Sequence, residues 1–376
     1  MKRSPAIFYS VFLVTGAATV LLGILLAHAS QAAAGDVRVG RLLAAQFCGQ
    51  IMGSLLLSRR AIRSLASGLM VLVLAGAAAA WMQRPILALL FVIGIGLGCV
   101  MASVNIAAAQ EVESTRRGSL LELLNVFWPI GAALCAPAVT VLGRYANPWR
   151  MYGVLALLFF VCLLWLGVTR PEHGFEAQSE TGALRRIPWM TLALLCLTSI
   201  LVVGVETGTA SWLPAFSARG GMSAGMIAAV TACFWCGSLL SRLTAAYLLK
   251  RMPLHRMCLV AAAGSVAAGA LLPSAAQPIA LCAMALCAAV CVAPLYPALV
   301  TDCVDLRYNG LIFMSAGLGS ALVPWSIGSV STHTGSLHLA MLVPAACAAM
   351  MMLTMWLAGM FTRQTNLPAG APSAGA

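Results

Sequence analysis

The stretch Thr198-Ser-Ile-Leu-Val-Val-Gly-Val-Glu-Thr-Gly-Thr-Ala-Ser-Trp-Leu213 is mostly apolar and carries a single charged residue, the carboxylate Glu206. A carboxylate at the centre of a bilayer-length segment costs about 2.5–3.5 kcal/mol on insertion scales. Acids that persist in such segments usually face the interior of a helix bundle or a water-filled cavity. The stretch therefore predicts a bundle of membrane helices with Glu206 on an inner surface.

The composition of the whole chain indicates the same class. Of its 376 residues, 61% are hydrophobic and only 9% are charged, and the mean hydropathy is +0.96. Soluble domains are roughly 45–50% apolar. We therefore predict an all-α polytopic membrane protein that contacts the lipid bilayer.

The net charge of +12 does not indicate a nucleic-acid partner, because the basic residues separate apolar runs and do not cluster. Most of the 13 cysteines lie inside apolar runs, where cysteine acts as a small hydrophobic residue. The one CxxC pair, Cys233 and Cys236, also lies in such a run. We therefore expect no metal, no redox site and no cofactor.

A spanning helix needs about 20 apolar residues. The N-terminal apolar run is too long for a signal peptide, so it is taken as the first span. The sequence predicts twelve spans, at residues 6–29, 38–57, 64–82, 86–109, 119–143, 149–169, 188–215, 223–247, 256–275, 278–300, 310–333 and 337–361.

The distribution of basic residues predicts the orientation. Twelve spans put both termini on one side, and 16 of the 22 Lys and Arg residues then lie on that side. The other six are Arg38, Arg41, Arg84, Arg144, Arg150 and Arg219. Cytoplasmic loops carry the excess of Lys and Arg. We therefore expect a cell inner membrane protein with both termini in the cytoplasm.

The longest polar stretch divides the chain into two halves. The predicted units are an N-terminal six-helix bundle at 1–169, a cytoplasmic linker at 170–187, a C-terminal bundle at 188–361 and a disordered cytoplasmic tail at 362–376. Short matches recur between the halves, such as Phe47-Cys-Gly-Gln-Ile-Met-Gly-Ser-Leu-Leu56 and Phe234-Trp-Cys-Gly-Ser-Leu-Leu-Ser-Arg-Leu243. Such repeats favour a duplicated carrier with parallel halves.

Four segments carry a resemblance to a known family. They are Gly204-Val-Glu-Thr-Gly-Thr-Ala-Ser-Trp-Leu-Pro-Ala-Phe216, Phe234-Trp-Cys-Gly-Ser-Leu-Leu-Ser-Arg242, Asn125-Val-Phe-Trp-Pro-Ile-Gly-Ala-Ala-Leu-Cys-Ala-Pro137 and Gly94-Ile-Gly-Leu-Gly-Cys-Val-Met-Ala-Ser-Val-Asn105. Together they resemble the fucose permease-like (fucose:proton symporter) branch of the major facilitator superfamily. The resemblance implies a carrier of two six-helix bundles with its substrate near the middle of the membrane.

The resemblance also implies site residues. Asn125 matches a substrate-facing position in the fifth span, Asn105 matches an Asn of the fourth, and Glu206 matches the acid of the seventh. Proton-coupled sugar carriers of this branch place acids in the first and fourth spans. Those positions here are Gly23 and Met101, so the resemblance does not supply the usual proton relay.

Other residues are candidates from their chemistry. Glu206 is either a substrate-contacting or coupling acid or a structural carboxylate bonded to its neighbours. Gln50, Asn105 and Asn125 either contact substrate or join helices through hydrogen bonds. Trp212 is the preferred aromatic for stacking on a ligand, although membrane tryptophans often pack or lie at interfaces. Glu122 either takes part in coupling or stabilises the start of a helix.

Basic residues near the cytoplasmic side predict a gate. Arg59 and Arg60 follow the second span, and Arg242 needs an acidic partner, for which Asp302 is a candidate. Plain anchoring at the membrane surface explains the same residues equally well.

We therefore expect a secondary active transporter, not an enzyme, that moves a small polar solute such as a sugar or related metabolite. It is expected to work as a monomer and to use protons as a coupling ion if Glu206 serves that role. The alternatives are an exporter of a small metabolite or drug, which the apolar Gly23 and Met101 would suit, and a membrane sensor or assembly protein on a carrier scaffold.

Overall fold

A computed structural model describes residues 6–29, 35–56, 61–110, 114–169, 187–248, 251–303, 306 and 308–359. The first half of the chain forms six long helices: α1 (Ala6–Ala29), α2 (Asp36–Leu55), α3 (Ala61–Met82), α4 (Leu87–Gln110), α5 (Ser114–Leu142) and α6 (Met151–Thr169). A short 3-10 turn, Pro148–Arg150, precedes α6.

The second half repeats this plan with more interruptions. Its helices are α7 (Trp189–Arg219), α8 (Ala224–Leu248), α9 (Leu254–Leu271), α10 (Pro278–Val292), α11 (Leu295–Cys303), α12 (Asn309–Thr334), α13 (Leu337–Ala340) and α14 (Val343–Leu357). The predicted span at 278–300 consists of α10 and α11, and the one at 337–361 contains α13 and α14. The first break contains Pro294, which has no N–H to continue a helix, and Pro344 lies in the first turn of α14.

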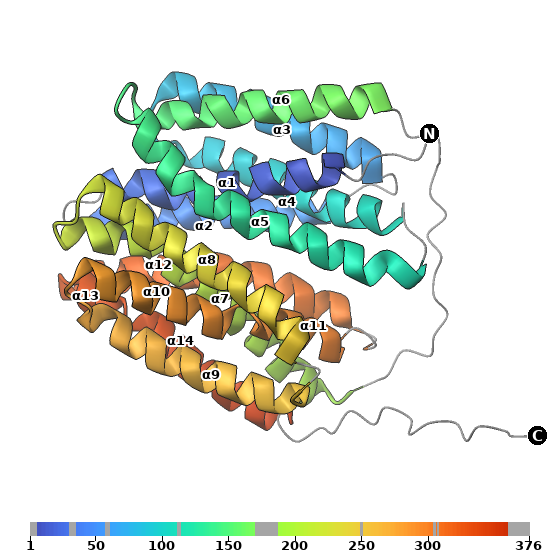
Figure 1. Ribbon diagram of the computed structural model, residues 1–376, viewed down its shortest axis with the longest axis vertical. Coiled ribbons are helices and arrows are strands. Elements are labelled where there is room, and N and C mark those ends of the chain that lie inside the picture. Colours follow the sequence, from blue (N-terminus) through green and yellow to red (C-terminus); the bar gives the residue numbers. More distant parts are fainter. Residues whose placement is uncertain are drawn as a thin grey trace, which may run out of the picture.

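The twelve-span, two-bundle fold predicted from the sequence is confirmed. Figure 1 shows α1–α6 packed as one group and α7–α14 as the other. Across the boundary between these bundles, α2 contacts α12, α5 contacts α8 and α1 contacts α7. Among the residues that the structure describes, ten helical segments are long and apolar enough to cross a membrane, and α2 is not one of them.

Many hydroxyl groups inside the helices are bonded within their own helix, as suits an apolar surrounding. The hydroxyls of Thr15 and Thr207 donate to the carbonyls of Val11 and Val203, four residues earlier, at 2.7 Å in each case. Such bonds let a hydroxyl lie within a membrane helix without an unpaired donor.

Helices α2 and α4 meet backbone to backbone. A Cβ on Gly98 of α4 would overlap the carbonyl oxygen of Gln50 on α2, and a Cβ on Gly49 of α2 would overlap that of Phe91 on α4. Small residues permit this close approach between membrane helices. The contact fixes the polar face of α2 beside that of α4.

Candidate functional site

A partly open cavity of about 420 Å³ lies between the two bundles. Its lining comes from α1, α2, α4 and α5 on one side and from α7, α8, α11 and α12 on the other. Pockets of roughly 300–1,000 Å³ that combine apolar walls with a few polar groups are typical of small-molecule sites. The boundary between the bundles is therefore the candidate binding site.

Helical spacing explains which side chains line the cavity. On α4 the lining residues are Gly98, Met101, Ala102 and Asn105, and on α2 they are Phe47, Gln50, Ile51 and Ser54. Both sets follow the i, i+3, i+4, i+7 pattern of a single helix face. One face of each helix thus provides a continuous wall.

The cavity occupies the middle of the molecule and one of its ends. Its residues lie in the second halves of α2, α4 and α8 and in the first half of α12, and these segments converge at the end where α1 begins. The other end, where α2 begins and α7 and α12 finish, contributes none of the lining residues among those described. We call it the Asp36 end, after the residue that starts α2.

Glu206 on α7 lies in this cavity together with Arg242 on α8. The two side chains approach to 3.9 Å between Arg242 Nη2 and Glu206 Oε1, too far for a hydrogen bond. The hydroxyl of Ser238 donates to the same carboxylate oxygen at 3.2 Å. Glu206 is 12% and Arg242 23% exposed, so the cavity holds a loosely paired acid and base.

The predicted neutral polar residues also line the cavity. Asn105, Asn125 and Gln50 lie on its wall, all from the first bundle. The amide nitrogen of Asn105 donates to the carbonyl of Met101 on its own helix at 2.9 Å. The amide oxygen of Asn105 can therefore accept from another group. Their positions agree with the substrate contacts that the sequence predicts for them; the contacts themselves stay predictions.

The aromatic residues of the cavity are not those that the sequence favoured. Trp128 of α5 and Trp235 of α8 line it and pack edge to face across the bundle boundary, with ring centroids 5.0 Å apart. Trp212 is fully buried, and its indole Nε1 donates to the carbonyl of Pro324 at 2.8 Å.

The expectation that Trp212 stacks on a ligand is therefore corrected. Six residues turn an α-helix by about 240°, so Trp212 and Glu206 point in different directions from α7. Ala210, four residues from Glu206, shares its face and lines the cavity. Trp212 instead packs between α7 and α12.

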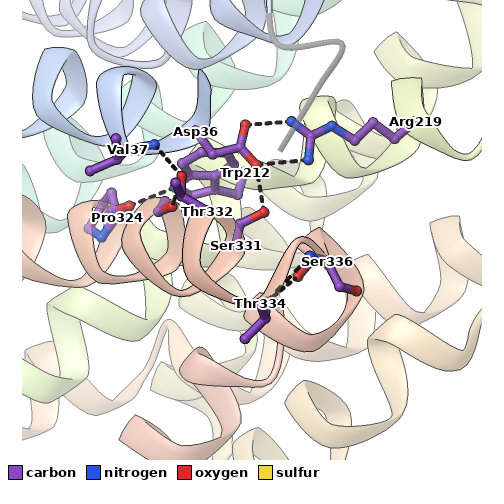
Figure 2. Close-up of polar contacts among 10 residues, drawn as sticks. Asp36, Val37, Trp212, Arg219, Pro324, Ser331, Thr332, Thr334 and Ser336 are labelled. Atoms are coloured by element: carbon purple, nitrogen blue, oxygen red, sulfur yellow. Dashed lines mark hydrogen bonds and ion pairs between the residues drawn. The ribbon is translucent and has the colours of Figure 1, made fainter. Parts of the chain in front are cut away.

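The Asp36 end is closed by a buried ionic contact that sequence reasoning did not single out. The carboxylate of Asp36 accepts from both terminal nitrogens of Arg219, one at 2.8 Å, and from the hydroxyl of Ser331 at 2.6 Å. Figure 2 shows the three side chains converging from α2, α7 and α12. We call these residues the Asp36 cluster; they join the first bundle to the second.

Neighbouring contacts reinforce the Asp36 cluster. The backbone N–H of Val37 donates to the Thr332 hydroxyl at 2.9 Å, again between α2 and α12 (Figure 2). The hydrogen bond from Trp212 to the Pro324 carbonyl also joins α7 to α12 (Figure 2). Asp36 is fully buried, and it lies in the first turn of α2, where the helix dipole favours negative charge.

The predicted cytoplasmic gate is only partly described. Arg59 and Arg60 lie outside the described residues, as do the side chains of Glu122 and Asp302. Arg242 lies in the cavity, and the carboxylate with which it pairs among the described residues is Glu206. Arg242 thus lies inside the site, and the gating role predicted for it with Asp302 stays a prediction.

Comparison with known proteins identifies the relatives of this architecture. The family model described as Major Facilitator Superfamily matches residues 6–324. No curated protein sequence matches the chain. Among solved structures, the E. coli fucose:proton symporter FucP is 20% identical, with 96% of this chain and 98% of that chain covered and a TM-score of 0.61.

Two further structures align at 14% identity. The inward open form of the E. coli xylose transporter XylE has a TM-score of 0.76 with 97% of each chain covered. The nucleoside transporter NupG has a TM-score of 0.71, with 96% of this chain and 98% of that chain covered. These likenesses concern the fold.

Proposed function

The chain belongs to the major facilitator superfamily and is a secondary transporter, not an enzyme; we propose that it moves a small polar solute, sugar-like or a related metabolite, by alternating access. The observation that carries this proposal is the cavity between the bundles, closed at one end by the Asp36 cluster. A solute held there touches both bundles. Rocking of one bundle against the other would then expose it to the opposite side.

The orientation of the chain supports an inward-facing state. From the excess of Lys and Arg we infer that the end where α1 begins lies on the cytoplasmic side of an inner membrane. The cavity then faces the cytoplasm, and the Asp36 cluster closes the outer side.

The same orientation gives the domains their roles. We assign residues 1–169 and 188–361 to the two moving bundles, 170–187 to a cytoplasmic linker and 362–376 to a cytoplasmic tail. Glu206, Asn125, Asn105 and Gln50 are the proposed substrate contacts. Asn105, Asn125 and Gln50 lie on the first bundle and Glu206 on the second, so a bound solute would be held by both.

Export of a metabolite is the competing direction of transport. The two positions where related sugar carriers hold a coupling acid are Gly23 and Met101 here. Met101 lines the cavity, and a Cβ on Gly23 would come within 2.9 Å of the Ser211 carbonyl oxygen, so Gly23 has no room for an acidic side chain. Right-side-out and inside-out membrane vesicles distinguish the two directions. Import gives faster uptake in the first and export gives faster uptake in the second.

The test of the proposed function is solute movement in proteoliposomes, measured across a panel of sugars and small metabolites with and without a pH gradient. Ala210→Trp places a large ring in the cavity and should abolish uptake. Leu157→Trp is the matched control, because Leu157 is 62% exposed on the outer surface of α6. Both variants are checked by size-exclusion chromatography for folding.

Two results would overturn the proposal. Uptake by the Ala210→Trp variant at the wild-type rate would show that solute does not pass through this cavity. Failure of the wild type to move any solute of the panel in either direction would favour a sensor or assembly role on the same scaffold.

A further inference from the structure

The guanidinium of Arg242 makes few polar contacts for a largely buried cation. Its one acidic partner among the described residues, Glu206, lies at 3.9 Å, and its Nε is buried without a hydrogen-bond partner there. An Arg side chain offers five donors in a planar fork that matches a carboxylate in a two-bond arrangement. A cation with this much unused donor capacity in a cavity is typical of an anion-binding position.

The neighbouring unpaired groups are donors as well. Among the described lining residues, the buried nitrogens Gln50 Nε2, Trp128 Nε1 and Trp235 Nε1 have no hydrogen-bond partner either. The buried acceptor Gln46 Oε1, also unpaired, does not line the cavity. Unpaired buried donors are costly, and a native structure normally satisfies them through a water or a ligand. The cavity therefore has unpaired buried donors, which acceptor atoms of a ligand can satisfy.

The charge of the site limits how negative that ligand can be. Arg242 is the one cationic side chain among the described lining residues, and Glu206 already offsets part of its charge. A second full negative charge on the ligand would face Glu206 with no further cation to balance it, and such repulsion is strong where the dielectric constant is low. A singly charged carboxylate fits the site better than a phosphate dianion.

Resting on the transport role proposed above, we propose that the substrate is a small hydroxylated monocarboxylate of the sugar-acid class, whose carboxylate pairs with Arg242. Without substrate, the Glu206 carboxylate is loosely paired with the Arg242 guanidinium. The substrate carboxylate then replaces Glu206 as the partner of that guanidinium. Gln50 from the opposite bundle, with Trp128 and Trp235, donates to the remaining oxygens. Substrate recognition thus joins both bundles through acceptor atoms that the protein itself does not supply.

The binding test uses matched solutes that differ in one group. Thermal unfolding of the purified protein is followed with D-glucuronate against D-glucose, D-gluconate against D-glucitol, and D-glucose 6-phosphate as the dianion. A ligand that binds only the folded state raises the unfolding midpoint. We expect the carboxylates to raise it and the neutral partners and the phosphate ester to leave it unchanged.

The residue test uses four variants. Arg242→Gln should weaken carboxylate binding at least about tenfold, the loss expected for hydrogen bonds to a charged group. Arg242→Lys, which keeps the charge without the fork, should lose less. Glu206→Gln should bind carboxylates more tightly than the wild type, since it removes the anion that competes for Arg242. Arg256→Gln is the control, because Arg256 is exposed at the start of α9.

The outcomes separate this inference from the proposed function. Neutral sugars that bind as well as their carboxylate partners, carboxylates without effect on the wild type, or binding that Arg242→Gln leaves unchanged would each overturn the carboxylate assignment. Transport of neutral sugars alone in proteoliposomes would overturn it while leaving the transporter intact. Carboxylate binding without any movement across the membrane would instead overturn the proposed function.

Discussion

The carboxylate of Asp36, at the first turn of α2, is paired with the guanidinium of Arg219, 183 residues later at the last turn of α7. Asp36 is fully buried and Arg219 is 19% exposed. The pair bridges the two bundles at the end opposite the cavity. The alternating access proposed above would open this end, and the ion pair would then break in every transport cycle.

Replacement of Asp36 by Asn should favour the outward-open state. Asn keeps the size of the side chain but removes the charge that Arg219 faces, and the loss of one partner of a buried ion pair costs about 3–5 kcal/mol. The partial exposure of Arg219 places the expected cost at the lower end. Pulsed electron paramagnetic resonance between labels at Tyr145 and Ile279, in a cysteine-free background, measures the opening.

Tyr145 and Ile279 are exposed at the Asp36 end, one in each bundle. Longer distances should gain population in Asp36→Asn, and Ser331→Ala should produce a smaller shift because it removes a single hydrogen bond. Arg150→Gln, an exposed charge at the same end, should leave the distances unchanged. Identical distance distributions in the wild type and Asp36→Asn would rule out a gating role for the pair.

Trp212 and Trp235 should respond differently to replacement by Phe. Trp212→Phe loses the bond to Pro324 and leaves a gap, so the protein should lose about 1–3 kcal/mol of stability with substrate affinity kept. Trp235→Phe removes a donor that has no partner among the described residues, so affinity should fall while stability changes less. Thermal unfolding and ligand titration measure the two effects. The reverse pattern would return Trp212 to the binding site.

Gly131 should tolerate no side chain. A Cβ there would overlap the carbonyl oxygen of Leu13, so Gly131→Ala must push α5 away from α1. Overpacking commonly costs about 1–3 kcal/mol, and backbone contact puts this site at the upper end or beyond. The control is Gly167→Ala on α6, where a Cβ meets no other atom within 4 Å. Ala should stabilise that helix by up to about 1 kcal/mol.

The thermal unfolding midpoint of each alanine variant provides the measurement. Equal midpoints for the two variants would mean that α1 and α5 are not in backbone contact.

Glu206 should link transport to the pH gradient. Among the described lining residues the ionisable side chains are Glu206, Arg242 and Tyr296, so a bound carboxylate leaves one excess negative charge unless a proton enters with it. One-for-one coupling supports about tenfold accumulation per pH unit. Uptake into proteoliposomes should therefore accelerate with an acidic exterior.

The Glu206→Gln variant tests where that proton binds. It should lose the response to the pH gradient but retain exchange of labelled for unlabelled substrate, which needs no net proton movement. A full pH response in this variant would place the coupling group elsewhere. Uptake by the wild type that ignores the gradient would exclude symport and leave the carrier mechanism standing.

The fold could be predicted from the sequence because its signals are local. Apolar runs of bilayer length located the spans, and the Lys and Arg asymmetry agreed with their number. What hydropathy missed were the interruptions before Leu295 and before Val343, because the chain stays apolar across both. Proline alone does not mark them, since α7 continues through Pro214. The continuation of α7 to Arg219 was missed for the opposite reason: its last turn is polar although still helical.

The site was predictable only where one helix carries the signal. Glu206 was found because a lone carboxylate in an apolar run is conspicuous. Asp36 was not, because it precedes the apolar part of α2 and its partners lie 183 and 295 residues away. Trp212 was misplaced because the prediction counted its distance along the helix and ignored its angle about the helix axis. The nearness of Arg242 to Glu206 was missed because the two residues lie on different helices.

The polar face of α2 has a consequence for the making of the protein. This helix carries Asp36, Arg38, Arg41, Gln46 and Gln50. Among the described residues, it and α12 both fall outside the ten segments that are apolar enough to cross a membrane by themselves. Its buried polar groups are bonded to other helices: Asp36 to α7 and α12, and Gln46 to the Thr19 carbonyl on α1. Its insertion must therefore wait for partner helices, and α12 is among the last to be synthesised. The helix at the centre of the bundle boundary should be the one whose membrane integration depends most on completion of the chain.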